Sequence, residues 1–442
     1  MKTKLKTVPG SIVAARGFKA SGVFCDIKTL GTGAGSNKGA KRDLALIFSE
    51  RPAAVAGMFT TNQVCAAPVK LCIERTRKRQ AQAIVANSGN ANACTGRQGM
   101  EDAREMASFA EQCLKIPSGL ALVGSTGRIG LNLPMDHVRA GIVEAAVQLG
   151  SSPGHAANAA EAIMTSDTRA KAIAVEFRLG GKTARLGGIC KGAGMIQPIM
   201  TSNGARTSFG ALHATMLCFL TTDAAVTSLV LQKALGQAVS SSFNRITVDG
   251  DMSTNDTVLI LANGAAQNAP VKSPTTRDAL AFQAALDHVC LELAKMIVRD
   301  GEGVSHVVTV RVTGARSVVE ADAAARAVAN SALVKTSWHG GDPNWGRIMD
   351  ALGYSRARVV ESKVDLGYSR PGAREILWSL RRGQPTRATF KELCAAVAPN
   401  EFDLHINLNL GSGQALIYAA DLTEEYVAFN KGDVSDPASL GG

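Results

Sequence analysis

Aromatic residues are scarce in this chain: Phe, Trp and Tyr together make up 5% of its 442 residues. Long apolar runs are missing as well, and none approaches the roughly 20 residues that a membrane-spanning helix needs. The N-terminus, Met1–Lys6, has no apolar segment behind it, so no secretory signal is expected. We therefore expect a cytoplasmic protein that has no membrane partner.

Paired cysteine motifs are also absent. The nine cysteines are odd in number, and no two of them stand at C-x-x-C spacing. A chain of this length can bury a large core and needs no disulfide cross-links. Reduced thiols are therefore expected, which agrees with a cytoplasmic location.

Metal-ligand patterns and the common nucleophile motifs are lacking too. None of the seven histidines stands at metal-ligand spacing from a cysteine or a carboxylate, and the chain has no G-x-S-x-G elbow. The glycine-rich stretch Gly31–Gly39 fits neither the dinucleotide nor the P-loop template. We expect neither a metal nor a nucleotide cofactor, and no hydrolase built around a histidine.

The net charge is +11, from 48 Lys and Arg against 37 Asp and Glu. The dense basic run Arg75–Arg79 has no aromatic residues between its charges, which weakens a nucleic-acid interpretation. A charge spread over the surface for solubility is the simpler explanation. A positive field would also attract carboxylate substrates.

Apolar residues at 46% and charged residues at 19% are typical of a folded globular protein. Strand-like segments recur, and the first two flank a turn at Glu50–Pro52; they cover residues 44–48, 55–59, 83–87, 120–123 and 308–312. Helical periods cover residues 99–115, 136–149 and 281–298. Residues 404–410 alternate between apolar and polar side chains, and 414–420 return as the partner strand of a hairpin. This mixture predicts an α/β fold, with a domain boundary near 314–330.

The peptide bond between Ala214 and Thr215 is the most informative position in the chain. It lies within Ala214-Thr215-Met216-Leu217, just before an apolar segment. If this bond breaks, Thr215 becomes an N-terminus that carries a hydroxyl nucleophile and an amine on adjacent carbons. The amine titrates near pH ~8 and can accept the hydroxyl proton, so no histidine is needed. One cut would create a complete nucleophile for acyl transfer.

Three other short motifs contain candidate site residues. Ser125-Thr126-Gly127 follows an apolar strand, where a hydroxyl and a backbone N–H on a tight turn would meet an oxyanion. Lys191 precedes a Gly-x-Gly turn and is a candidate for a substrate carboxylate. Glu302 stands at a helix end between two glycines and is a candidate for a substrate ammonium group. Taken singly, each is more often a turn or a solvated side chain.

Taken together and in order, the motifs resemble the ornithine acetyltransferase (glutamate N-acetyltransferase) family, called ArgJ, almost from end to end. The matching segments are residues 43–47, 59–62, 67–69, 87–96, 125–127, 163–168, 191–196, 214–217, 242–257, 341–347 and 421–427. The segment 242–257 (Ser-Phe-Asn-Arg-Ile-Thr-Val-Asp-Gly-Asp-Met-Ser-Thr-Asn-Asp-Thr) resembles the longest signature of the family.

The resemblance implies the architecture. A layered αββα-type sandwich of mixed α+β structure would span residues 1–314, and a smaller C-terminal α/β domain would span 315–400. A final hairpin and tail, 401–442, would return to the active site. Self-cleavage would give an α chain, 1–214, and a β chain from 215 that stay associated, usually as a dimer of αβ units.

The resemblance also implies the site. Thr215 would be the nucleophile and, through its free amine, the base, while Thr126 and Gly127 would form the oxyanion hole. Six residues would bind the substrate: Thr165, Lys191, Thr215, Glu302, Asn430 and Ser435. The implied reaction is ping-pong: N2-acetyl-L-ornithine acylates Thr215, ornithine leaves, and L-glutamate takes the acetyl group. No cofactor is required, and acetyl-CoA is a possible second donor.

One departure from the family concerns the cleavage site. In the family the proline before the nucleophile lies four residues away, whereas here Pro198 lies seventeen residues before Thr215. The extra stretch, roughly Thr201 to His213, has a loop-like composition and either slows self-cleavage or bulges into solvent. Thr201 and Ser202 are rival nucleophile positions, but no Met-Leu follows them. Two alternatives stay open: a threonine amidase or aminopeptidase on a similar scaffold, and a non-catalytic family member.

Overall fold

The structure is a computed structural model that describes residues 4–28, 41–205 and 216–431. The stretch Gly31–Gly39, the cleavage-site residues Ala214 and Thr215, and the tail residue Ser435 lie outside these ranges. The described residues form two compact units. The first contains the chain up to Asn244 together with Met252–Ile297, and the second contains Arg245–Asp251 and Val298–Lys431.

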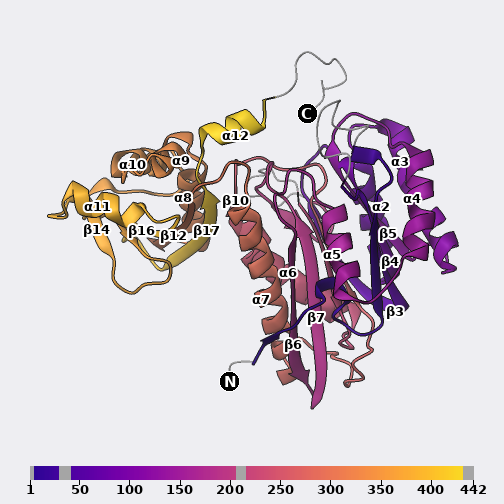
Figure 1. Cartoon of the computed structure of the whole chain (residues 1–442). Helices are drawn as coiled ribbons and strands as arrows, with labels where there is room; N and C mark the ends of the chain where they lie inside the picture. Colours follow the sequence, from indigo (N-terminus) through magenta and orange to yellow (C-terminus); the bar gives the residue numbers. More distant parts are fainter. Residues whose placement is uncertain (1–3, 29–40, 206–215, 432–442) are drawn as a thin grey trace. The chain divides into compact units, whose positions relative to one another are not determined.

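The first unit is built on one large sheet with strand order β1-β6-β7-β9-β11-β3-β4-β5, to which β2 and β8 add by pairing with β3 (Figure 1). Its strands are β1 (Lys6–Thr7), β2 (Phe18–Val23), β3 (Leu44–Thr60), β4 (Gln80–Asn90), β5 (Ala121–Arg128), β6 (Lys171–Leu179), β7 (Lys182–Lys191), β8 (Met200–Thr201), β9 (Leu217–Thr222) and β11 (Thr257–Ala262). Strands β9 and β11 are buried along their whole length. Such apolar strands are covered on both faces, which explains why they show no polar alternation.

Helices cover this sheet. They are α2 (Ala67–Thr76), α3 (Gly96–Leu114), α4 (Met135–Val147), α5 (Pro153–Ala162), α6 (Ser228–Ser241) and α7 (Arg277–Arg299). Helix α7 packs on β6 and β7: the rings of Phe282 and Phe177 are 6.4 Å apart, and the Cys190 thiol lies 3.7 Å from the carbonyl of Leu293. The helical period predicted for 281–298 is thus confirmed, and the apolar stripe faces the sheet.

Two local predictions for this unit are wrong. The segments 44–48 and 55–59 are not separate strands around a turn at Glu50–Pro52, because β3 runs through both. A register shift between Phe48 and Ala53 marks a bulge against β4, and a bulge is a place where a strand tolerates proline. Likewise, Ser125-Thr126-Gly127 does not form a turn after a strand but lies inside β5.

The second unit has its own sheet, with strand order β10-β17-β12-β16-β13-β14-β15. The strands are β10 (Ile246–Thr247), β12 (Val307–Ala315), β13 (Asp365–Ser369), β14 (Leu377–Arg381), β15 (Gln384–Pro385), β16 (Glu401–Asn407) and β17 (Gly413–Ala420). The helices are α8 (Val318–Asn330), α9 (Ala332–His339), α10 (Trp345–Gly353), α11 (Phe390–Val397) and α12 (Glu424–Phe429). A separate apolar core, which includes Val310, Trp338 and Phe402, lies between this sheet and its helices.

The hairpin predicted for 404–410 and 414–420 is wrong. Strand β16 ends at Asn407 and so covers only the first part of 404–410, whereas β17 covers 414–420. Strand β12 lies between them, parallel to β16 and antiparallel to β17. The short Gly411–Gly413 turn therefore crosses over a neighbouring strand. Burial alternates along residues 404–407 of β16, and such periodicity does not reveal the inserted partner.

The fold class is confirmed: both units mix helices and strands, and the C-terminal unit is the smaller one. The division between them differs from the expected boundaries at 314 and 400. The second unit already begins at Val298, it also takes up Arg245–Asp251 through β10, and it contains both β16 and β17.

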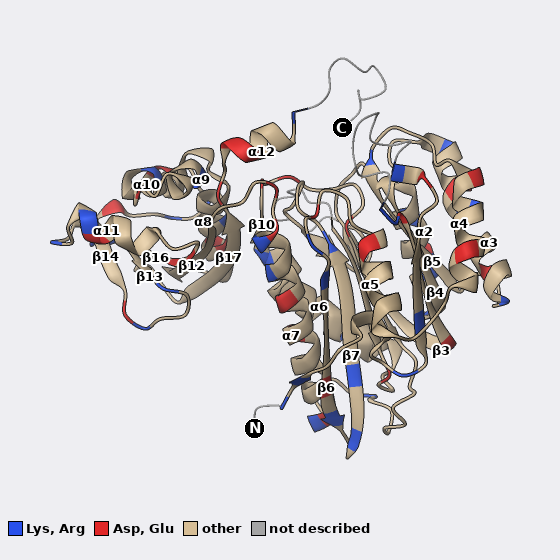
Figure 2. Cartoon of the chain, viewed as in Figure 1, with Lys and Arg blue, Asp and Glu red and all other residues tan. Residues whose placement is uncertain are grey.

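Positive and negative side chains are interspersed on the helices of the first unit. Figure 2 shows both signs on α3 and α4, where Arg139 pairs with Glu105 and with Asp136. This mixing fits a solvated surface better than a nucleic-acid patch. Among the helices of the described residues, none is both long and apolar enough to cross a bilayer.

Candidate active site

Thr126 and Gly127 lie where the parallel strands β4 and β5 end together. The register pairs Gly89 with Gly127, and Thr126 is completely buried. Gly127 has a φ of +130°, and a Cβ there would lie 2.3 Å from the carbonyl carbon of Gly89. A side chain at this position is excluded both by the backbone conformation and by the neighbouring strand. This glycine therefore permits a close approach of two backbones next to a candidate oxyanion hole.

Gly127→Ala should lower the free energy of unfolding by about 3 kcal/mol, since strain and overpacking each cost about 1–3 kcal/mol. Urea unfolding of both proteins measures the difference. Gly130→Ala is the matched control: Gly130 also has a positive φ, +89°, but a Cβ there would meet nothing within 4 Å. Equal losses in the two variants would contradict the close approach described here.

Lys191 and Thr126 come together from different parts of the sheet. Lys191 is the last residue of β7 and is 2% exposed, and its Nζ lies 3.3 Å from the Thr126 Oγ1. Strand β7 pairs with β9, with Lys191 opposite Leu217, two residues after Thr215 in the chain. The structure thus joins two of the residues proposed from the sequence and places both close to the start of β9.

A buried carboxylate, Asp167, holds this lysine's surroundings together. One of its oxygens accepts the Lys171 ammonium at 2.6 Å and the Gly192 N–H at 2.7 Å, and the other accepts the Thr165 N–H at 2.9 Å. Burial would raise the pKa of Asp167, but the charges of Lys191 and Lys171 outweigh it and lower the pKa to about 2. Thr165, another predicted site residue, is therefore tied through its backbone to the same cluster.

A second buried carboxyl, Asp256, marks the start of β9. Its Oδ1 accepts the N–H of Met216 at 2.6 Å, while its buried Oδ2 has no hydrogen-bond partner among the described residues. Burial raises the pKa of this carboxyl well above its ordinary value; the Met216 hydrogen bond and the charge of Lys191 act in the other direction. The peptide bond held by Asp256 is the one that joins Met216 to Thr215.

Neither carboxyl was identified as a site residue from the sequence. The sequence does contain a signal for each: Asp167 stands four residues before Lys171, and Asp256 lies in the long signature segment 242–257. Gly192, which bonds to Asp167, and Met216, which bonds to Asp256, are 25 and 40 positions away in the chain, so the sequence does not show these pairings.

A small cavity opens beside Gly127. It has a volume of about 80 Å³ and is lined by Ala91, Gly127, Ile129, Met195, Ser253, Thr254 and Asn255. The Asn255 amide closes one wall, because its Nδ2 donates to the carbonyls of Ala91 at 2.6 Å and Ser125 at 2.8 Å. The size suits a small group such as an acetyl rather than a whole amino acid.

Glu302 and Asn430 meet in the second unit. The Asn430 Nδ2 donates to the Glu302 Oε2 at 2.9 Å and to the carbonyl of Tyr426 at 2.9 Å. These two predicted site residues are 128 positions apart in the chain, and both keep side-chain surface exposed to solvent. Ser435, Ala214 and Thr215 lie outside the described residues, so their predicted roles stay predictions.

The start of the extra stretch is ordered. Thr201 belongs to β8, opposite Phe59 of β3, so the loop expected from Thr201 onward begins later than predicted. The Thr201 Oγ1 donates to the carbonyl of Ala205 at 3.1 Å and contacts the Asn203 side chain at 3.3 Å. These contacts close a local turn, which makes Thr201 a weaker rival to Thr215.

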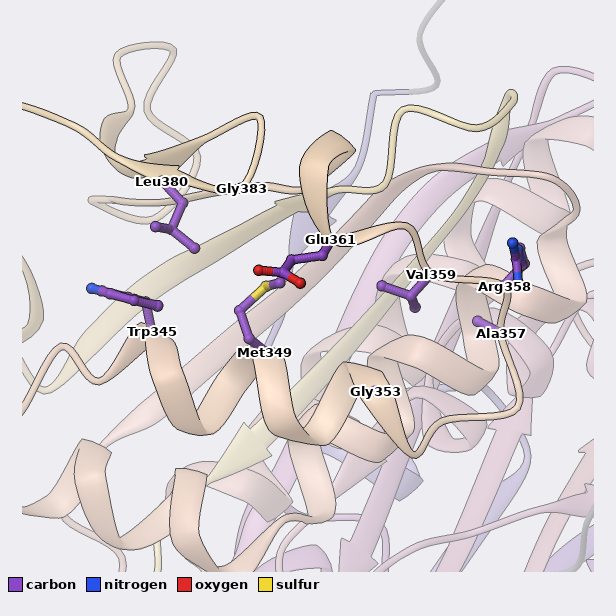
Figure 3. A pocket seen from close by; sticks show the side chains of 9 residues that line it. All are labelled: Trp345, Met349, Gly353, Ala357, Arg358, Val359, Glu361, Leu380 and Gly383. Carbon is purple, nitrogen blue, oxygen red and sulfur yellow. The ribbon is translucent and has the colours of Figure 1, made fainter.

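The second unit also has a larger hollow, of about 470 Å³ (Figure 3). Helix α10 contributes Trp345, Met349 and Gly353 from one face, and Glu361, Leu380 and Gly383 approach from across it. The Trp345 side chain is 39% exposed, and Asn344 caps α10 by accepting the Arg347 N–H. None of the predicted site residues that the structure describes lines this hollow.

Comparison with known proteins finds that the ArgJ family model matches residues 23–432. The arginine biosynthesis bifunctional protein ArgJ of Symbiobacterium thermophilum is 47% identical, covering 96% of this chain and 99% of that protein. The glutamate N-acetyltransferase of Methanocaldococcus jannaschii is 41% identical over 96% of this chain and 99% of its own. Among solved structures, an ornithine acetyltransferase from Mycobacterium tuberculosis complexed with ornithine is 33% identical, with a TM-score of 0.40, over 45% of this chain and 100% of that chain.

Proposed function

Because the chain belongs to the ArgJ family, we propose that it transfers the acetyl group of N2-acetyl-L-ornithine to L-glutamate in arginine biosynthesis. The observation that carries this proposal is a family match over nearly the whole chain that includes every predicted site residue except Ser435. The meeting of Lys191 with Thr126 supports it independently, because these residues are 65 positions apart. The resemblance inferred from the motifs is confirmed by the match.

The proposed reaction begins with self-cleavage. The Thr215 hydroxyl attacks the carbonyl of Ala214, the peptide nitrogen takes a proton as the C–N bond breaks, and water hydrolyses the resulting ester. The products are two chains, 1–214 and 215–442, and a free amine on Thr215. The bond from Met216 N–H to Asp256 supports this step, since it fixes the backbone on one side of Thr215.

Transfer then takes place in two halves. The Thr215 Oγ attacks the acetyl carbonyl while the α-amine takes its proton, and the bond to the ornithine nitrogen breaks as that nitrogen is protonated. The ester keeps the energy of the acetyl group, so no added energy source is needed. The amine of glutamate then attacks the ester, which breaks and returns the proton to Thr215.

The described residues have distinct roles in this scheme. The Thr126 hydroxyl and the Gly127 N–H stabilise the oxyanion of each tetrahedral intermediate. Lys191, whose Nζ lies beside the Thr126 hydroxyl, attracts the substrate carboxylate, and Glu302 with Asn430 binds the polar groups of the amino-acid substrate. No cofactor takes part in this scheme, and acetyl-CoA is a second candidate donor.

Two measurements on the purified protein test the proposal. Intact-mass spectrometry should show two chains that meet between Ala214 and Thr215. Ornithine release from N-acetylornithine should depend on glutamate and outrun hydrolysis; the same assay with acetyl-CoA decides whether that donor is used. Faster acetyl release to water than to glutamate would favour the amidase alternative, and no acetyl release at all would favour a non-catalytic protein. The dimer of αβ units and the cytoplasmic location stay predictions.

A further inference from the structure

Residues 302–306 and 420–430 of the second unit form a connected structure that we call the C-terminal clamp. One segment follows α7 and contains Glu302; the other follows β17, includes α12 and ends at Asn430. More than a hundred residues of chain separate them. None of the proposed steps above uses the contacts between them other than the Glu302–Asn430 bond.

Thr423 joins the two segments directly beside Glu302. Its Oγ1 donates to the carbonyl of Gly303 at 2.8 Å and accepts the N–H of Tyr426 at 3.1 Å, capping α12. Gly303 has a φ of +66°, and a Cβ there would lie 2.5 Å from the Tyr426 nitrogen. The chain next to Glu302 is therefore pressed against the first turn of the helix that leads to Asn430.

Asp421 fixes the same segment two residues farther along. Its Oδ1 accepts the Ser305 N–H at 3.0 Å, and its Oδ2 accepts the Ser305 hydroxyl and lies 3.1 Å from the His306 Nδ1. In return, the Asp421 N–H donates to the carbonyl of His306 at 3.0 Å. The Asp421 side chain has no exposed surface, so these bonds are shielded from water and hold firmly.

Lys335 braces the clamp from α9. Its Nζ donates to the carbonyl of Ala420, and its own carbonyl accepts the Leu422 N–H at 3.4 Å. Burial lowers the pKa of Lys335 to about 8, against the opposing effect of Asp249 and Asp421. Burying a lysine is costly unless its ammonium group is hydrogen-bonded, and here it bonds to the Ala420 carbonyl. This bond indicates that the position of the Ala420–Thr423 turn is closely determined.

We propose that Thr423 and Asp421 are positioning residues. They hold the Glu302 carboxylate and the Asn430 amide in the relative positions that substrate binding requires. The inference rests on the proposed function, in which those two groups bind the amino-acid substrate. The Glu302–Asn430 bond is solvent-exposed, and a bond of this kind does not hold two side chains in place by itself. The buried bonds on either side do so, and binding then costs less side-chain and loop entropy.

The test compares Thr423→Val, which keeps the shape but removes the hydroxyl, with Thr423→Ser, which keeps the hydroxyl. Thr423→Val should raise the KM for N-acetylornithine about tenfold and change kcat less than twofold, because acetyl chemistry at Thr215 is untouched. Thr423→Ser should stay within about twofold of the unaltered protein in both. Steady-state release of ornithine in the presence of glutamate gives both constants.

Thr389→Val is the matched stability control. Thr389 caps α11 in the same unit through a capping box, and within the described residues its side chain bonds only to Glu392. Thr389→Val should lower the melting temperature about as much as Thr423→Val does, but it should leave the KM for N-acetylornithine unchanged. Should Thr423→Val fail to fold, Asp421→Asn replaces it with the same expected rise in KM.

Two results would overturn the inference. One is a KM for Thr423→Val equal to that of Thr423→Ser; the other is an equal rise in KM for Thr423→Val and Thr389→Val. Failure of the proposed function is a separate observation, because the unaltered protein would then show no glutamate-dependent transfer. The intact mass of each variant also shows whether self-cleavage, which does not involve the clamp, has taken place.

Discussion

Thr215→Ala is expected to give one uncut chain of 442 residues with no acetyl transfer above background. The methyl group cannot attack the Ala214 carbonyl, so the chain stays whole and no free amine forms at residue 215. Nucleophile and base are lost together, and a fall in kcat on the order of 10⁶ is expected, as when the nucleophile of a serine protease is removed. Intact-mass spectrometry and the ornithine-release assay measure both effects.

Thr215→Ser is the control, because it keeps a hydroxyl and an amine on adjacent carbons. It should still cut itself, though with a different rate. The fold of Thr215→Ala should survive, since the N–H that Asp256 accepts belongs to the main chain of Met216, which the substitution leaves in place. An uncut Thr215→Ala protein with full transfer activity would disprove the N-terminal nucleophile.

The sequence patterns predicted single elements better than their pairing. The apolar stripe of residues 281–298 identified α7, because a one-sided helix buries every third or fourth residue. The strand at 414–420 and the first part of the strand at 404–410 were also correct, but the two strands are not neighbours. Alternation shows only that one face is buried; it carries no information on which strand lies alongside, and a short turn made the hairpin the simplest assumption.

The candidate site shows the same limit. Lys191 and Thr126 were identified singly, by motif, and the sheet brings them within 3.3 Å. Asp167 and Asp256 were missed because their importance depends on burial beside particular N–H groups and lysines from other elements. A carboxylate in a sequence is usually solvated. Asp167 and Asp256 become parts of the candidate site only because the folded chain buries them beside these partners.

Asp167→Ala should be the most destabilising single change in the described part of this site, costing about 3–5 kcal/mol of unfolding free energy at pH 7. The Asp167 side chain is fully buried and bonds to Lys171, which is 1% exposed. Removal of the carboxylate leaves the Lys171 and Lys191 charges buried without the group that compensates them. The Thr165 and Gly192 N–H groups lose their acceptor as well. Urea unfolding with intact-mass confirmation measures the loss.

The pH dependence of the unfolding free energy distinguishes the contribution of the Asp167 charge from that of its packing. Its pKa is lowered from 3.8 to about 2 in the folded protein, so its stabilising effect is complete above about pH 4 and disappears as the pH falls through 3.8 toward 2. Asp167→Asn keeps the shape, and the gap to the unaltered protein should be about 2 kcal/mol at pH 7 and shrink toward zero below pH 3. A gap that stays constant from pH 7 to pH 3 would mean that packing, not the ion pair, stabilises this corner. Lys191 would then owe its position beside Thr126 to the sheet alone, and Asp167→Asn would leave the KM of the substrate unchanged.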